Sequence, residues 1–207
     1  MAESKRNNYV SPLGEFYKGT THAFFGNRGP LHENGRVVRD WVNKRWLVCV
    51  TADLGPPESF MAPGHHTELF FLDEATALAA GQRPCFRCRP DAFKAFIKLF
   101  DERRPLTSPR APSMDDFLHA DRLNVDGTRR LFTAPAAKLP DGVFVVIKGE
   151  PWLIAGGALH KWTQNGYTEH APLPAGNVSV LTPAVTVEVI AAGYRPQIDA
   201  SALGLST

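Results

Sequence analysis

The sequence predicts an α+β protein, in which helices and strands occupy separate stretches of the chain. Three observations carry this prediction. Residues 93–100 hold an apolar stripe with the period of an α-helix, residues 143–170 hold short apolar runs divided by turn dipeptides, and residues 103–113 form a Pro- and Ser-rich linker between them. We therefore expect a small module around a cysteine turn at residues 1–105, followed by a linker helix and a small antiparallel β module with a terminal helix at residues 106–207.

The first third of the chain predicts loops and short strands. Residues 34–35 read Asn-Gly, which is typical of a type I′ hairpin turn. Apolar residues predict one strand over 37–42, and alternating residues predict a second over 46–51. Cys49 lies within this second strand. The apolar run at 69–72 predicts a third, short strand.

Two helices are expected on either side of the cysteine turn. Asp73 is a suitable N-cap for a helix over 74–80, and Gly81 can end that helix in the left-handed conformation. Pro90 suits the first position of the next helix. The buried stripe of that helix consists of residues spaced i, i+3, i+4 and i+7, namely Phe93, Phe96, Ile97 and Phe100.

The second half begins with a short helix and continues as strands. Ser113 and Asp116 resemble a capping box that opens a helix over 114–122. The apolar runs that follow predict an antiparallel meander, with an Asn-Gly turn at 165–166. Residues 182–183 read Thr-Pro and mark the start of the terminal helix.

Composition limits the class of protein. The chain has 207 residues, of which 43% are hydrophobic, and no apolar run reaches the length of a transmembrane helix. The first ten residues lack the apolar core of a signal peptide, and three cysteines do not suggest a disulfide framework. We therefore expect a cytoplasmic protein without a membrane partner. Up to Arg110 the chain holds 16 Lys and Arg against 12 Asp and Glu, a bias that suits an anionic partner.

The cysteine turn reads AAGQRPCFRCRP, with Cys85 and Cys88 in C-x-x-C spacing. This spacing lets one turn aim two thiolates at a single zinc ion. A redox pair would instead sit at a helix N-terminus directly after a strand. The third interpretation is two small, inert residues in a turn. A second cysteine pair, which would make the zinc motif specific, is absent.

The segment FFLDEATALAAGQRPCFRCRP, at residues 70–90, resembles the second half of the zinc-binding domain of Ada-type DNA repair proteins. The shared pattern is an apolar strand, an acid-capped helix and A-G-x-R-P-C-x-x-C-R-P. The resemblance implies that Cys85 and Cys88 are metal ligands. Ada-type proteins take methyl groups from DNA phosphotriesters with a first cysteine pair, which this sequence lacks. The resemblance therefore extends to fold and zinc but not to that reaction.

Several residues are candidates for the remaining zinc ligands. Cys49 lies in the strand ahead of the lost cysteine pair and could face the site, although free cysteine is also a common core residue. His65 and His66 are nearer in sequence to the lost ligands, but adjacent side chains point different ways, so at most one of them would bind. His32, in GNRGPLH, is another candidate.

Two classes of function remain open, with a structural or interaction protein as a third. In the first, a DNA-binding or DNA-repair-associated protein uses basic residues around the cysteine turn to contact phosphates. In the second, an enzyme acts on a small anionic substrate in a pocket between the modules, using His32, Arg28 and a cysteine. The candidate nucleic-acid-binding residues of the first class are Arg83, Arg87, Arg89, Lys44 and Arg45.

Overall fold

The computed structural model describes residues 7–55 and 59–204, which form an α+β fold with 26% helix and 28% strand. The predicted fold class is therefore confirmed. The outermost residues of the two expected modules, 1–6 and 205–207, lie outside the described residues, as does the short stretch 56–58.

The first sheet is mixed and has the strand order β2-β1-β7-β3-β6-β8. Its two parallel pairs are β1 with β7 and β6 with β8, and the other neighbours are antiparallel. A separate hairpin, β4-β5, turns through Asn34 and Gly35 with positive φ angles, as the Asn-Gly pair predicts. The strands are β1 (Tyr9–Val10), β2 (Phe16–Tyr17), β3 (Phe24–Asn27), β4 (His32–Glu33), β5 (Arg36–Val37), β6 (Leu47–Val50), β7 (Leu69–Phe71) and β8 (Arg83–Pro84).

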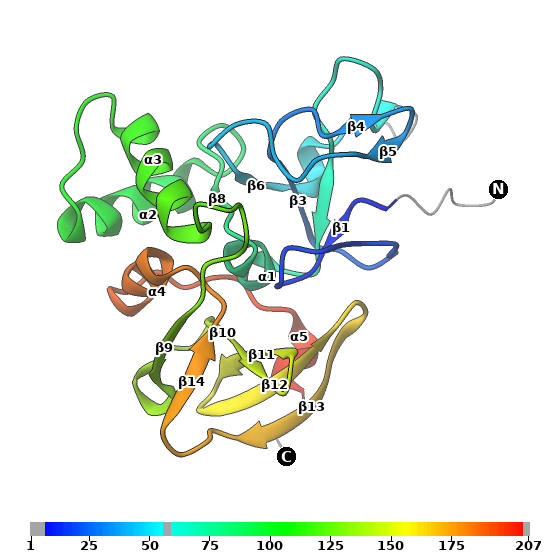
Figure 1. Ribbon diagram of the computed structural model, residues 1–207. Helices are drawn as coiled ribbons and strands as arrows, with labels where there is room; N and C mark the ends of the chain where they lie inside the picture. Colours follow the sequence, from blue (N-terminus) through cyan, green and yellow to red (C-terminus); the bar gives the residue numbers. More distant parts are fainter. Residues whose placement is uncertain (1–6, 56–58, 205–207) are drawn as a thin grey trace.

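The second sheet is antiparallel throughout, in the order β13-β12-β11-β10-β14-β9. Strands β10 to β13 follow one another as the meander that the turn dipeptides predict, and β14 returns between β10 and β9 (Figure 1). The strands are β9 (Phe132–Pro135), β10 (Phe144–Ile147), β11 (Glu150–Ala155), β12 (Ala158–Thr163), β13 (Gly166–Pro172) and β14 (Asn177–Val180).

The helices agree with the sequence prediction except near the linker and at the C-terminal end, where a second short helix, α5, follows the single terminal helix that was expected. Pro90 occupies the first turn of α2, as expected, and α4 begins directly after Pro183. The predicted capping box at Ser113 is wrong, because α3 begins a turn earlier and Ser113 lies inside it. The helices are α1 (Glu74–Ala79), α2 (Pro90–Arg103), α3 (Arg110–Arg122), α4 (Ala184–Ala191) and α5 (Ala200–Leu203), with 3-10 turns η1 (Thr51–Asp53) and η3 (Ala136–Lys138). No described helix is both long enough and apolar enough to pass through a bilayer.

One predicted strand is largely missing. The apolar residues at 37–42 form a strand only at β5, and Val38, Trp41 and Val42 have exposed side chains in the loop that follows. This loop runs over the surface, where single exposed apolar residues are common, so the apolar residues at 38–42 do not mark a strand.

Helix α1 lies between the two sheets and is buried on every side (Figure 1). Ala77 and Ala80 pack into the core of the first sheet, while Ala75 and Ala79 pack into the core of the second. Leu78 belongs to the largest core, which also includes residues of α2, α3, α4 and the second sheet. Small alanine side chains allow both sheets to approach the helix closely. The largest core therefore contains residues from both of the modules that the sequence predicts, on either side of position 105.

Two buried carboxylates at the start of α1 hold the chain after α4 in place. Asp73 caps the helix at the amide of Thr76, at 2.7 Å, and its other oxygen accepts bonds from the Tyr167 hydroxyl at 2.8 Å and the Asp199 amide at 3.0 Å. Glu74 accepts bonds from the Tyr194 hydroxyl and the Gln197 amide. These bonds are long-range, so α1 links residues near 73 to residues 194–199.

Candidate metal centre

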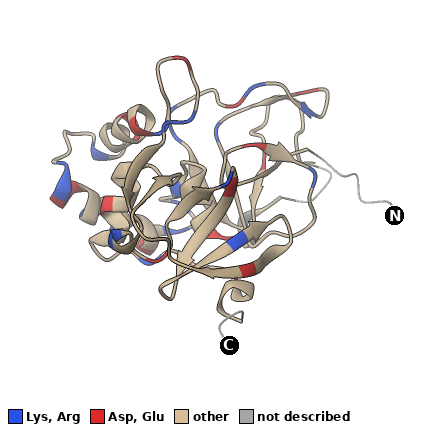
Figure 2. Cartoon of the chain, turned by 60° about the horizontal axis from the view of Figure 1, so that its bottom comes forward, with Lys and Arg blue, Asp and Glu red and all other residues tan. Residues whose placement is uncertain are grey.

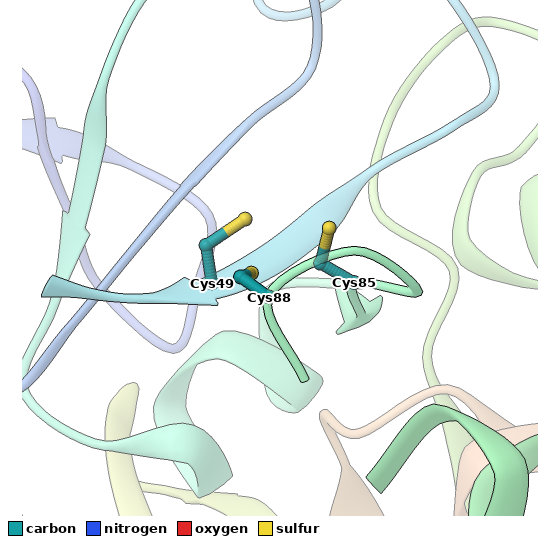
Figure 3. A group of neighbouring side chains, drawn as sticks. All are labelled: Cys49, Cys85 and Cys88. Atoms are coloured by element: carbon teal, nitrogen blue, oxygen red, sulfur yellow. The ribbon is translucent and has the colours of Figure 1, made fainter. Parts of the chain in front are cut away.

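Three cysteine sulfurs lie together where β6 meets the C-x-x-C turn (Figure 3). Strand β8 runs parallel to β6, and the amide of Cys85, just beyond β8, donates to the carbonyl of Val48 at 3.0 Å. This register sets Cys85 beside Cys49, and Cys88 follows in the turn that leads into α2. The three Sγ atoms all lie within 4.8 Å of one another. The structure therefore unites the C-x-x-C pair with the third cysteine of the chain.

Hydrogen bonds distinguish the three thiols. Cys49 and Cys85 are buried and Cys88 is half-buried. The pKa of Cys85 is lowered to about 5, because its sulfur accepts hydrogen bonds from the Cys49 thiol and from the backbone amides of Cys88 and Arg87. The pKa of Cys49 is raised, because its thiol donates to Cys85 and is buried, and burial also raises that of Cys88. Cys85 is therefore the readiest thiolate of the group.

A metal ion fits this donor set. Backbone amides that point at sulfur stabilise the thiolate form, which is the form that binds metals. A divalent cation at the common point of the three sulfurs would replace the protons that they share and lower all three thiol pKa values. The three cysteines can therefore hold a metal ion.

None of the three histidine candidates joins the three sulfurs. The ring of His32, on β4, bonds through Nδ1 to the Thr67 hydroxyl at 2.7 Å and through Nε2 to the Ala62 carbonyl at 3.1 Å. His65 and the adjacent His66 are exposed on a loop. Within the described ranges, no histidine or carboxylate lies as close to the sulfurs as they lie to one another. The geometry thus gives no support to His32 or His65 as the fourth ligand.

Two of the five candidate nucleic-acid-binding residues are buried in ion pairs. Arg83 donates from Nε and Nη2 to both carboxylate oxygens of Asp115, at 2.8 and 2.7 Å. Arg89 donates from Nη1 to Glu74 at 2.8 Å. The expectation that these two arginines face phosphates is corrected: their guanidinium groups anchor the two ends of the cysteine turn inside the protein.

The other three basic candidates are exposed. Arg87 lies between the two cysteines of the turn, and Arg45 lies just before β6. Lys44 forms an exposed ion pair with Asp116 at 2.7 Å. Figure 2 shows basic and acidic segments mixed along the visible elements. Any attraction for an anion near the cysteines must therefore come from a local group of arginines.

Such a group lines a cavity of about 530 Å³ beside Cys85. Its apolar lining includes two phenylalanines, Phe86 and Phe93, whose rings pack edge to face with centroids 5.4 Å apart. Phe86 is 63% exposed. Its basic residues are Arg45, Arg83, Arg87 and Arg110, of which Arg83 is paired with Asp115 and Arg110 with Asp101. Among the described residues, no carboxylate lines the cavity. The cavity suits a ligand that has both an anionic group and a flat apolar group.

The residues expected for a small-molecule enzyme do not meet. Arg28 lines a second cavity, next to Trp41 and Trp46, and His32 lines a third, on the β4-β5 hairpin. Cys85 lines the cavity beside the cysteine turn. Among the described residues, none of these three cavities therefore brings His32, Arg28 and a cysteine together.

The sequence did not indicate two features of this region. Arg110 reaches the cavity from α3, a helix that begins inside the expected linker. Phe86 lies between the two cysteines of the turn, and its position in the sequence gave no sign of an exposed aromatic ring. The contact between α3 and the cysteine turn depends on the Arg83–Asp115 pair, which joins residues 32 positions apart.

Comparisons with known proteins leave the family open: no protein-family model, curated protein or solved structure matches this chain.

Proposed function

We propose that Cys49, Cys85 and Cys88 bind one zinc ion as thiolates. The observation that carries this proposal is the convergence of all three sulfurs within 4.8 Å. Soft thiolate donors favour zinc, copper(I) and iron–sulfur clusters over magnesium and calcium. The resemblance of residues 70–90 to the Ada-type zinc domain supports zinc among these metals, because Cys85 and Cys88 match family ligands.

Three protein ligands leave one coordination position of a tetrahedral zinc ion to water or to a bound molecule. We expect solvent there, because the described residues offer no further nitrogen or carboxylate ligand at this point. The open position distinguishes this centre from a four-cysteine knuckle. It gives no reason to assign the methyl-acceptor reaction, because the cysteine pair that the family uses is absent.

Elemental analysis tests the metal assignment. Protein purified without added chelator should contain one zinc ion per chain. Cobalt(II) added to metal-free protein should show the intense thiolate-to-cobalt absorption band. Cys49→Ser should weaken both signals as Cys85→Ser and Cys88→Ser do, whereas His65→Ala, an exposed control, should leave them unchanged. Metal-free parent protein that takes up neither ion would refute the proposal.

We further propose that the arginine-lined cavity beside Cys85 binds DNA. Arg45 and Arg87 are exposed at its edge and would contact phosphates, while Phe86 would stack on a base. Arg45 and Arg87 have no ion-pair partner among the described residues, which favours a polyanion. The zinc ion would hold the turn that carries Phe86 and Arg87 in one conformation.

Salt dependence separates this role from small-molecule binding. Fluorescence anisotropy with a labelled single-stranded oligonucleotide should show affinity that falls steeply with salt. Arg87→Gln should weaken binding to all sequences and reduce the slope of log K against log salt by about one. Arg103→Gln, which removes an exposed arginine at the far end of α2, is the matched control. Equal slopes in both variants would contradict DNA binding at the cavity.

A further inference from the structure

Trp46 lies at the centre of a second group of arginines. Its side chain is 2% exposed, and the guanidinium carbons of Arg28 and Arg122 lie 4.0 and 4.4 Å from the ring centroid. Arg129 approaches the same place. A Cβ added to Gly81 would meet Arg122, Arg129 and Trp46, each at 3.2 Å. Three positive charges therefore converge around one indole ring.

None of these three arginines has an ion-pair partner in the described part of the chain. Their hydrogen bonds within the described part of the chain go to uncharged oxygens. Arg28 donates to the Gln82 side chain and to the carbonyls of Ala80 and Asp40, Arg122 to the carbonyls of Leu118 and Lys44, and Arg129 to the carbonyls of Ala79 and Leu181.

The positive charge of the group is not balanced. Burial and repulsion from Arg129 and Arg122 lower the pKa of Arg28. Burial is also the main cause that lowers the pKa of Arg122 to about 9 and that of Arg129 to about 10, although Asp115 and Asp121 offset part of the effect. Nη2 of Arg122 and both Nε and Nη1 of Arg129 are buried without a hydrogen-bond partner. A buried charge is unfavourable unless an opposite charge compensates it.

A cavity of about 430 Å³ opens next to this group. Arg28 and Arg129 line it, and Trp46, Trp41 and Phe16 contribute aromatic surface. Two exposed acidic residues, Glu15 and Asp40, also line it, but neither forms an ion pair with the described arginines. This cavity shares no lining residue with the one beside Cys85. The two are separate candidate sites.

We propose that this cavity binds the phosphate group of a small organic phosphate with a planar ring, such as a mononucleotide. A phosphate monoester carries a charge of about −1.5 to −2 at pH 7, which suits the two arginines that line the cavity, Arg28 and Arg129, better than a single carboxylate does. Arginine donors suit phosphate oxygens. Trp41, which is 38% exposed, offers a ring face at the cavity for the planar part of the ligand.

The first experiment uses the full chain and three probes: inorganic phosphate, adenosine monophosphate and adenosine. Thermal unfolding is followed in chloride and in phosphate at equal ionic strength, and calorimetry gives the affinities. We expect phosphate to raise Tm above its value in chloride, the mononucleotide to bind more tightly than phosphate, and adenosine to bind most weakly. An equal Tm in chloride and phosphate, together with no heat from the mononucleotide, would overturn the proposal. An aromatic carboxylate that binds as tightly as the mononucleotide would also overturn the assignment to phosphate.

The second experiment places the ligand. Arg129→Gln should weaken mononucleotide binding about tenfold or more, because it removes a charged donor. Arg130→Gln changes the adjacent, exposed arginine and should leave binding unchanged. Trp41→Ala should lower affinity for the mononucleotide more than affinity for inorganic phosphate. The proposal fails if Arg129→Gln is folded and binds as tightly as the parent protein.

The same variant separates a ligand site from a structural role. Without ligand, Arg129→Gln relieves repulsion within the group, so its Tm should equal or exceed that of the parent in chloride, and phosphate should no longer raise it. A variant that is less stable in chloride but still gains the full increase in phosphate would show that Arg129 supports the fold and does not bind the anion.

Discussion

Two sets of buried arginines in this protein differ in what balances their charge. Arg83 and Arg89, at the two ends of the cysteine turn, each pair with a buried carboxylate. Arg28 and Arg122, at Trp46, are equally buried but contact an aromatic ring, carbonyl oxygens and a side-chain amide. Burial alone therefore does not reveal the role of an arginine. A pair with matched charge holds a fold together, while unmatched charge beside a cavity indicates a place for an anion.

Breaking a matched pair should have the largest effect. Arg83→Met leaves Asp115 buried without its partner, and we expect a loss of about 3–5 kcal/mol in the free energy of unfolding. Urea unfolding measures this loss. Arg87→Met, at an exposed position in the same turn, should cost less than about 0.5 kcal/mol. A similar loss in both variants would show that the ion pair does not stabilise the turn.

The second matched pair should control the metal centre. Arg89→Met removes the partner of Glu74 and loosens the end of the turn that carries Cys88. Residues that support metal ligands typically contribute 10- to 100-fold in affinity, so we expect zinc affinity to fall by about that factor. Competition with a chromophoric chelator measures the affinity, with Arg103→Met as the control. An unchanged zinc affinity in a folded Arg89→Met variant would show that the Arg89–Glu74 ion pair does not support the metal centre.

Removing an unmatched charge should cost less than breaking a pair. Arg122→Met loses hydrogen bonds to carbonyls and the contact with Trp46, but it also removes repulsion and a desolvated charge. We expect the free energy of unfolding to change by less than about 1.5 kcal/mol. Urea unfolding in phosphate-free buffer, beside Arg83→Met, makes the comparison direct. If Arg122→Met destabilises the protein as much as Arg83→Met, a carboxylate partner does not decide how much a buried arginine contributes to stability.

The pKa of His119 should report the positive potential of the arginines that lack a carboxylate partner, Arg28 and Arg122. Its ring meets Trp41 and Trp46 edge-on, and burial, followed by Arg122 and Lys44, lowers its pKa. Because the folded pKa lies below the unfolded value of about 6.5, the folded protein binds this proton less readily. Stability from this group is complete above about pH 6.5 and is lost as pH falls through the folded pKa.

Proton NMR of the His119 ring gives this pKa directly. Arg122→Met should raise it toward the unfolded value, and His119→Phe should flatten the part of the stability profile between the two pKa values. A pKa that stays unchanged in Arg122→Met would mean that burial and Lys44, without Arg122, set the pKa of His119.

Local signals in the sequence predicted much of the secondary structure. The Asp73 cap, the Asn34-Gly35 hairpin and the spacing of the α2 stripe each depend on neighbours along the chain, and all three are confirmed. The capping box at Ser113 failed because its sequence pattern occurs within a helix that had already begun.

Long-range features could not be read in the same way. Cys49 meets the C-x-x-C turn through the parallel register of β6 and β8, which neither strand encodes alone. The arginines near the cysteines looked like surface residues because arginine is rarely buried. Their carboxylate partners, Asp115 and Glu74, lie 32 and 15 positions away, beyond any local pattern.

The bonds at the start of α1 also affect the order in which the protein can fold. Glu74, which binds Arg89 at the cysteine turn, receives bonds from residues 120 and 123 positions later in the chain. During synthesis those donors emerge from the ribosome well after the cysteines do. Glu74 is made before the cysteines, but it gains its complete set of bonds only once residues 194 and 197 are available, so the ion pair that supports the cysteine turn reaches its final form late in synthesis.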